Sequence, residues 1–143
     1  MSDNTASAGP VLVCITPQRS CAQLIKSGEM IALKTRSHLK VLAVFAKKNG
    51  ADKENSAILE ELYEAARMSD ATMSVYFNDS PDILAAVVAA KESASAVVTG
   101  FPRENSSGFV NRLHDLVPAI PIIMIDPEGT EHRILPEKPD KAK

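Results

Sequence analysis

The sequence predicts a single α/β domain built on a doubly wound, parallel five-stranded sheet with helices on both of its faces. Short apolar runs alternate with longer segments whose apolar residues recur every three or four positions, as in strands and amphipathic helices. The runs are apolar on both sides, which is typical of strands buried in a parallel sheet. A chain of 143 residues, 45% hydrophobic and 24% charged, suits one hydrophobic core.

The first half of the chain is expected to supply two strands and two helices. Val11–Thr16 is the first apolar run, and a helix follows it from Cys21 to about residue 36. Leu39–Ala46 is the second run. A polar loop then leads to a second helix that begins at Asn55 or Ser56 and carries an apolar stripe.

The second half continues this alternation with three more strands and two more helices. The third helix has the strongest start signal, because Ser80 can cap it, Pro81 suits its first position and Asp82 favours its positive end. Its inner stripe is expected to consist of Ile83, Leu84, Val87 and Val88. The remaining predicted elements are strands at Thr72–Phe77, Ala96–Gly100 and Ile120–Ile125, and a short helix from Phe109 to Val117.

Strands that alternate with helices imply right-handed crossovers and a flavodoxin-like sheet. The domain is expected to span residues 11–127, between a disordered leader at residues 1–10 and a polar tail at residues 128–143.

Charge and composition exclude several classes of partner. A net charge of −2 gives no field that favours nucleic acid or anionic lipid. No apolar stretch approaches the roughly 18 residues that predict membrane insertion, and the polar start is unlike a secretory signal. With only Cys14 and Cys21, a cytoplasmic, reducing location is expected.

Three segments carry a family resemblance: Val11–Ile25, Leu39–Phe45, and Ser80–Ile83 continued by Ser95–Gly100. Together they resemble a small universal stress protein, and most closely the stress-protein-like module of potassium-sensing histidine kinases. The resemblance implies the strand order 3-2-1-4-5, a homodimer formed through the last strand, and ATP binding, which many members show.

The residues that bind ATP in the family match this sequence poorly. Thr16 and Pro17 stand where an aspartate and a glycine follow the first strand, and Arg103 replaces the second glycine of the phosphate loop. Gly108 is followed by Phe109 rather than by Ser or Thr. Since glycines let backbone amides approach phosphates closely, the resemblance supports the fold more than it supports ATP binding.

A ligand site is nevertheless expected beyond the carboxyl ends of the first and fourth strands, where the strand order reverses. Arg19 and Arg103 would face a shared crevice above the first helix, whose free amides also favour an anion. Two solvated arginines on surface loops are the alternative. The residues assigned to this site are Thr16, Gln18, Arg19, Ser20, Gly100, Arg103, Ser106 and Ser107.

The last predicted strand indicates a second kind of site. An apolar strand at a sheet edge invites pairing with another chain, so a homodimer interface is expected there. Its residues are Ile122, Ile123, Met124 and Ile125. Alternatively, the tail from Glu128 to Lys143 covers this edge.

No catalytic constellation is recognisable in the sequence. His38, His114 and His132 lack a second ligand at metal spacing, and Cys21 lacks a nearby His or Asp partner. We therefore expect a non-enzymatic stress or regulatory module without a required cofactor, which binds a small anionic ligand such as ATP or another adenine nucleotide. The alternative is a protein-interaction module that acts by dimerising or by docking on a sensor kinase or transporter.

Overall fold

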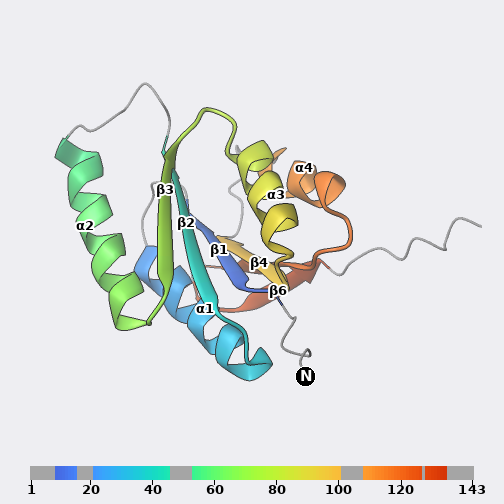
Figure 1. The fold of residues 1–143 in the computed structure, drawn as a ribbon, viewed down its shortest axis with the longest axis horizontal. Coiled ribbons are helices and arrows are strands. Elements are labelled where there is room, and N and C mark those ends of the chain that lie inside the picture. Colours follow the sequence, from blue (N-terminus) through green and yellow to red (C-terminus); the bar gives the residue numbers. More distant parts are fainter. Residues whose placement is uncertain (1–8, 16–20, 46–52, 101–107, 127, 135–143) are drawn as a thin grey trace, which may run out of the picture.

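The structure is a computed structural model that describes residues 9–15, 21–45, 53–100, 108–126 and 128–134. Its centre is a twisted sheet of six strands in the order β3-β2-β1-β4-β5-β6 (Figure 1). In chain order the elements are β1 (Val11–Ile15), α1 (Cys21–Thr35), β2 (Leu39–Phe45), α2 (Lys53–Met68), β3 (Thr72–Phe77), α3 (Pro81–Glu92), β4 (Ala96–Gly100), α4 (Gly108–Leu116), β5 (Ile122–Ile125) and β6 (Glu131–Ile134).

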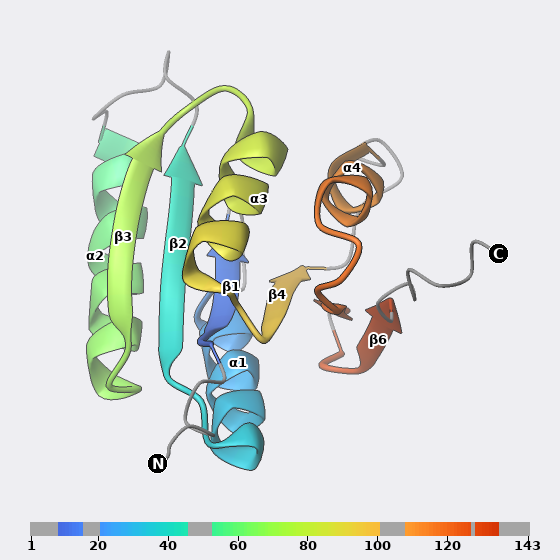
Figure 2. The same cartoon turned by 45° about the vertical axis from the view of Figure 1, so that its right-hand side comes forward.

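The first five strands are all parallel and follow the predicted order, which confirms the fold class. β1 pairs with β2 on one side and with β4 on the other, so the chain reverses its direction of winding at β1. Helices α1 and α2 pack on one face of the sheet, and α3 and α4 on the other (Figure 2). The reversal between β1 and β4 is the feature that positions the candidate site.

Alternate strand residues build the two halves of the core. On β1, Val11, Val13 and Ile15 face α1 and α2, whereas Leu12 and Cys14 face α3 and α4. Every residue of β1 is buried, because it is a central strand with a helix layer on each side. This explains why the run carries no alternation of polar and apolar side chains.

Helix α3 begins where the sequence predicts, but its details differ. Ser80 occupies the N-cap position, yet its side chain makes no capping bond, and its backbone N–H donates to Asn78 Oδ1 at 2.7 Å. Ile83 and Val87 are exposed, so the prediction that they face the core was wrong. Leu84 and Val88 do pack against the core as predicted, and the buried side chains between them are small, namely Ala85, Ala86 and Ala89.

Asp82, in the first turn of α3, is buried although it is charged. Arg112 on α4 places its Nε 3.0 Å from Asp82 Oδ2, so an ion pair joins the two helices on this face. The sequence predicted a dipole role for Asp82, and the position in the first turn agrees with that role.

The polar segment after Asp126 contains a strand that the sequence did not predict. β6 pairs antiparallel with β5, in a register that places Ile122 opposite Ile134 and Ile125 opposite Glu131. The tail at residues 128–143 is therefore partly structured, and the sheet has six strands rather than five. Among the residues that the structure describes, no helix is both long and apolar enough to cross a membrane.

Candidate functional site

The candidate ligand site lies at the carboxyl edge of the sheet, where β1 and β4 separate. Of the residues that the sequence assigns to it, the structure describes Gly100, the last residue of β4. The other seven lie outside the described residues: Thr16, Gln18, Arg19, Ser20, Arg103, Ser106 and Ser107. Their assignment therefore stays a prediction from the sequence.

Gly100 lies beside Ile125 of β5 and above the first turns of α1. A Cβ added at Gly100 would meet Leu24 Cδ1 at 3.7 Å, an ordinary van der Waals contact. Packing in the described structure therefore does not require a glycine here. A small residue at this position leaves open space at the end of β4, which suits the close approach of a ligand.

The turn between β5 and β6 forms the other side of this edge. Gly129 at its tip has a left-handed backbone, with φ of 88°, and a Cβ added there would meet Gln23 Nε2 of α1 at 3.4 Å. The turn thus lies close to the N-terminal half of α1, at the carboxyl edge of the sheet.

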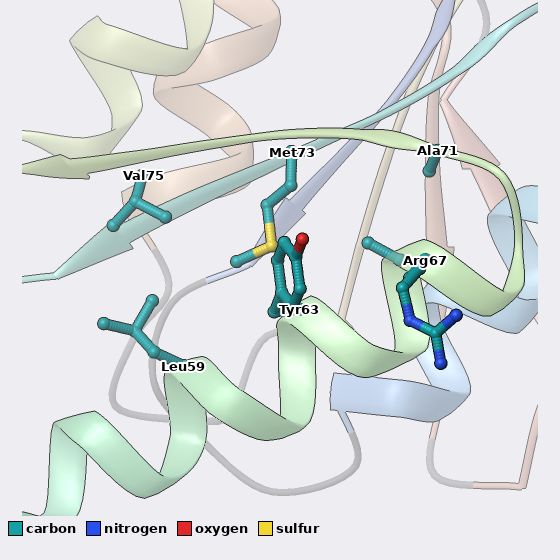
Figure 3. A pocket seen from close by; sticks show the side chains of 7 residues that line it. Leu59, Tyr63, Arg67, Ala71, Met73 and Val75 are labelled. Atoms are coloured by element: carbon teal, nitrogen blue, oxygen red, sulfur yellow. The ribbon is translucent and has the colours of Figure 1, made fainter.

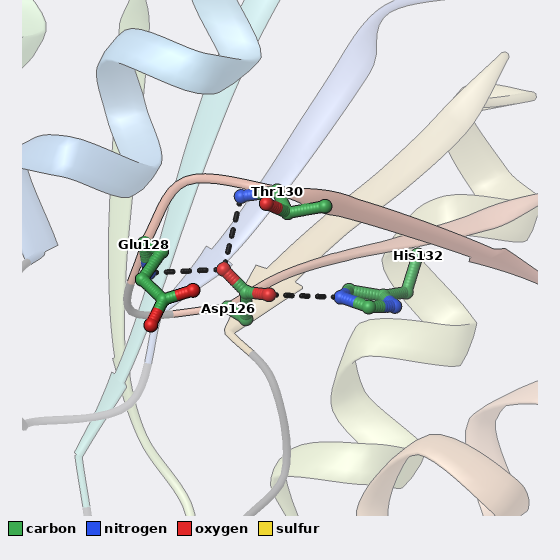
Figure 4. A network of polar contacts seen from close by, with 4 residues as sticks. All are labelled: Asp126, Glu128, Thr130 and His132. Atoms are coloured by element: carbon green, nitrogen blue, oxygen red, sulfur yellow. Dashed lines mark hydrogen bonds and ion pairs between the residues drawn. The ribbon is translucent and has the colours of Figure 1, made fainter.

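Asp126 organises this turn through three contacts (Figure 4). Its Oδ1 accepts hydrogen bonds from the backbone N–H groups of Glu128 and Thr130, each at 2.9 Å. Its Oδ2 lies 2.9 Å from His132 Nε2 on β6. The His132 hydrogen bond, followed by the Thr130 amide, lowers the pKa of the Asp126 carboxyl, so this edge holds a carboxylate at neutral pH.

Sequence reasoning missed Asp126 and His132 as members of this edge. A signal was present, because Asp-Pro-Glu-Gly at positions 126–129 has the composition of a tight turn. The residues after it, Glu131 to Ile134, are mostly polar, so they lacked the apolar pattern that marks a strand. The turn signal alone, placed after an apolar strand, predicts a hairpin.

The pH dependence of stability tests the Asp126 network. The folded-state pKa of Asp126 lies below its ordinary value of 3.8, so its stabilising contribution is present above about pH 4 and is lost as the pH falls through the folded-state pKa. Asp126→Asn should lower stability at pH 7 and flatten the loss of stability in acid. Urea unfolding between pH 3 and pH 7 measures both effects.

Glu128→Gln is the matched control, because it removes a carboxylate from the same turn while the backbone N–H of residue 128 still reaches Asp126. A similar acid response in both variants would show that the Asp126 contacts do not stabilise the turn.

Two kinds of reactive side chain, metal ligands and thiols, bear on what the described part of the chain can do. No group of three or more His, Cys, Asp or Glu side chains there could hold a metal ion. Burial raises the pKa of the Cys14 thiol to about 12, so the reactive thiolate form is disfavoured at neutral pH. Cys14 is thus a packing residue of the core, as the sequence predicts.

The chain is similar in fold to a solved structure. No protein-family model and no curated protein matches the chain. A crystal structure of a protein from the universal stress protein family of Burkholderia pseudomallei does match, with a TM-score of 0.59 and 14% sequence identity. The alignment covers 83% of this chain and 96% of that one. The chain has the universal stress protein fold.

The strand on which the sequence predicted a dimer interface is not an edge strand of the universal stress protein fold seen here. The prediction placed the interface on Ile122, Ile123, Met124 and Ile125, because β5 was expected to be a free edge. That premise was wrong, since β6 hydrogen-bonds along the whole of β5 and the tail supplies the cover. The three isoleucines are buried inside the domain. Homodimer formation itself stays a prediction.

Proposed function

We propose that this chain is a cytoplasmic, non-enzymatic regulatory module with a stress-related role, and that it binds a small anionic ligand between β1 and β4. The candidate ligand is an adenine nucleotide. The observation that carries the proposal is the reversal of winding at β1, because open α/β sheets bind ligands beyond the carboxyl ends of the strands where the order reverses.

Two features support an anion on the β1 side of this crevice. Helix α1 begins at Cys21, shortly after β1 ends at Ile15, so its free N–H groups and positive end lie at this edge of the sheet. The sequence adds Arg19 before the helix and Arg103 after β4, and guanidinium groups bind phosphates in a bidentate manner.

The β5 side of the edge favours a different part of the ligand. The Asp126 carboxylate can only accept hydrogen bonds and would repel a phosphate. A ligand with phosphate at one end and hydroxyl or amine donors at the other complements both sides. A nucleotide has this polarity, whereas inorganic phosphate does not.

A thermal-shift screen with ATP, AMP, cyclic mono- and dinucleotides, NAD and phosphate tests the proposal. A ligand that binds only the folded state at 100 times its Kd adds about 2.7 kcal/mol, which raises the midpoint by several degrees. We expect one nucleotide to raise it and phosphate to raise it less. Arg19→Ala and Arg103→Ala should abolish the shift, while Lys34→Ala, at the far end of α1, should retain it.

The second candidate function is a protein-interaction module without nucleotide binding, acting through dimerisation or by docking on a sensor kinase or transporter. Apolar side chains left exposed on β3 and α3, including Tyr76, Phe77 and Val87, favour it. Failure of every nucleotide in the screen, with a folded protein, would select this function over ligand binding.

A further inference from the structure

β3 and β6 are the two edges of the sheet, and no strand of the described residues pairs with the outer side of β3. The backbone N–H of Asn78 donates to Phe45 O of β2 at 2.8 Å, so the backbone groups of Asn78 point toward β2. Backbone groups of successive strand residues point to opposite edges. Met73, Val75 and Phe77 therefore direct their N–H and C=O groups away from β2, which gives six groups along the outer edge of β3.

This edge lacks the devices that normally prevent pairing. Natural edge strands are protected by charged residues, prolines or bulges. β3 reads Thr-Met-Ser-Val-Tyr-Phe, with no charge and no proline, and it pairs with β2 in an unbroken register. Val75, Tyr76 and Phe77 are 38%, 41% and 40% exposed. The edge is thus uncharged, regular and apolar.

A cavity of about 370 Å³ lies beside this edge, between α2 and β3 (Figure 3). Tyr63 stands next to Met73, and Leu59 lies below Val75. Arg67 is the charged residue of the lining, and its guanidinium is paired with Glu64 in its own helix. The full lining is Leu59, Tyr63, Ala66, Arg67, Ala71, Met73 and Val75.

We propose that a second copy of this chain occupies the edge, with its β3 antiparallel to the first and a two-fold axis at Val75. Residues whose backbone groups point outward must pair with one another, and centring on Val75 uses all six groups within the strand. Val75 then lies opposite Val75 of the partner subunit, and Met73 opposite Phe77 of the partner subunit. The two sheets join into one sheet of twelve strands.

The side chains agree with this register. Phe77 of the partner subunit arrives next to Met73, where it can fill the cavity under Tyr63 and form an aromatic contact. On the other face Ser74 lies opposite Tyr76 of the partner subunit, so the small side chain leaves room for the large one. No pair along the strand brings like charges together.

The exposed area also suits a second copy. Tyr63 is 63% exposed, and with Tyr76 and Phe77 it offers on the order of 300 Å² of aromatic surface. The strand backbone and the cavity lining add to this, toward the roughly 800 Å² per partner of a standard interface. We therefore infer a dimer that depends on concentration rather than a permanent one. A two-fold interface also closes on itself, so β3 is not left free to extend into fibres.

Cysteine cross-linking tests the register directly. In a Cys21→Ser background, Val75→Cys places two thiols on the axis, at a Cα separation of about 5.5 Å, inside the range that a disulfide spans. We expect a disulfide-linked dimer under mild oxidation. Ser74→Cys is the matched control, since its side chain points to the other face and meets Tyr76 of the partner subunit. It should remain mostly monomeric on a non-reducing gel.

Light scattering over a range of concentrations gives the independent readout. The wild-type mass should rise from 15.4 kDa toward twice that value, and Val75→Lys should hold it at 15.4 kDa while thermal unfolding remains cooperative. A wild-type protein that stays at 15.4 kDa throughout would overturn the proposal. So would a dimer that Val75→Lys leaves intact, or equal cross-linking of both cysteine variants. Nucleotide binding at the β1–β4 crevice is measured separately and can fail without affecting this result.

Discussion

Leu42→Ala is expected to destabilise the domain by about 2–5 kcal/mol, the range observed when a fully buried leucine is truncated. Leu42 is completely buried in the middle of β2, where it lies between Cys14 of β1 and Ser74 of β3. It packs in the core half beneath α3 and α4, and the rigid strands on both sides limit collapse of the resulting cavity. Urea unfolding followed by circular dichroism measures the loss.

Leu33→Ala is the matched control for this prediction. Leu33 lies on α1 with 68% of its surface exposed, so the same chemical change should alter stability by no more than about 0.5 kcal/mol. If Leu42→Ala costs as little as Leu33→Ala, then β2 is not a central strand of the sheet and the topology described above is wrong.

Gly28→Ala is expected to destabilise the domain although alanine favours helices. A Cβ at residue 28 would lie 2.3 Å from Val13 Cγ2 and 3.2 Å from Leu39 Cδ1. Val13 is fully buried and β-branched, so it cannot turn away cheaply. Overpacking of this kind costs about 1–3 kcal/mol, against a gain of roughly 1 kcal/mol in helix propensity. Thermal and urea unfolding should both show a net loss.

Gly100→Ala is the control glycine, because its Cβ would meet its nearest neighbour at 3.7 Å. Its stability should stay close to that of the wild type. A stabilised Gly28→Ala variant would mean that α1 does not approach β1 as closely as the structure describes.

Most of the fold could be predicted because a strand that is buried on both faces appears in the sequence as a short, nearly continuous apolar run. The run that became β1 is apolar throughout, and those that became β2 and β4 are mostly apolar, with Lys40 and Thr99 as the polar exceptions. β6 could not be found in this way. It is an edge strand whose residues, Glu131 to Arg133, are exposed, so neither alternation nor apolar content marks it.

The site was harder to predict than the fold. The reversal at β1 follows from the order of elements together with the family resemblance, and it placed Gly100 at the correct edge. The Asp126 turn depends on pairing between β5 and β6, which brings residues together only after the sixth strand has formed. The pairing of two strands cannot be predicted from the pattern of residues within either strand alone. The exposed Val87 shows the same limit, since Ala85 and Ala89 are fully buried on this helix while Val87 is not.

The central claim is that a nucleotide binds where β1 and β4 separate, and two-dimensional amide NMR tests it most directly. Labelled protein is titrated with the nucleotide that gives the largest thermal shift. The account predicts that amide signals shift at Leu24, Gly100 and the Asp126 turn, all at the carboxyl edge of the sheet. Unchanged spectra with every nucleotide tested, or shifts confined to the opposite edge around Ser37 and Ser95, would contradict it.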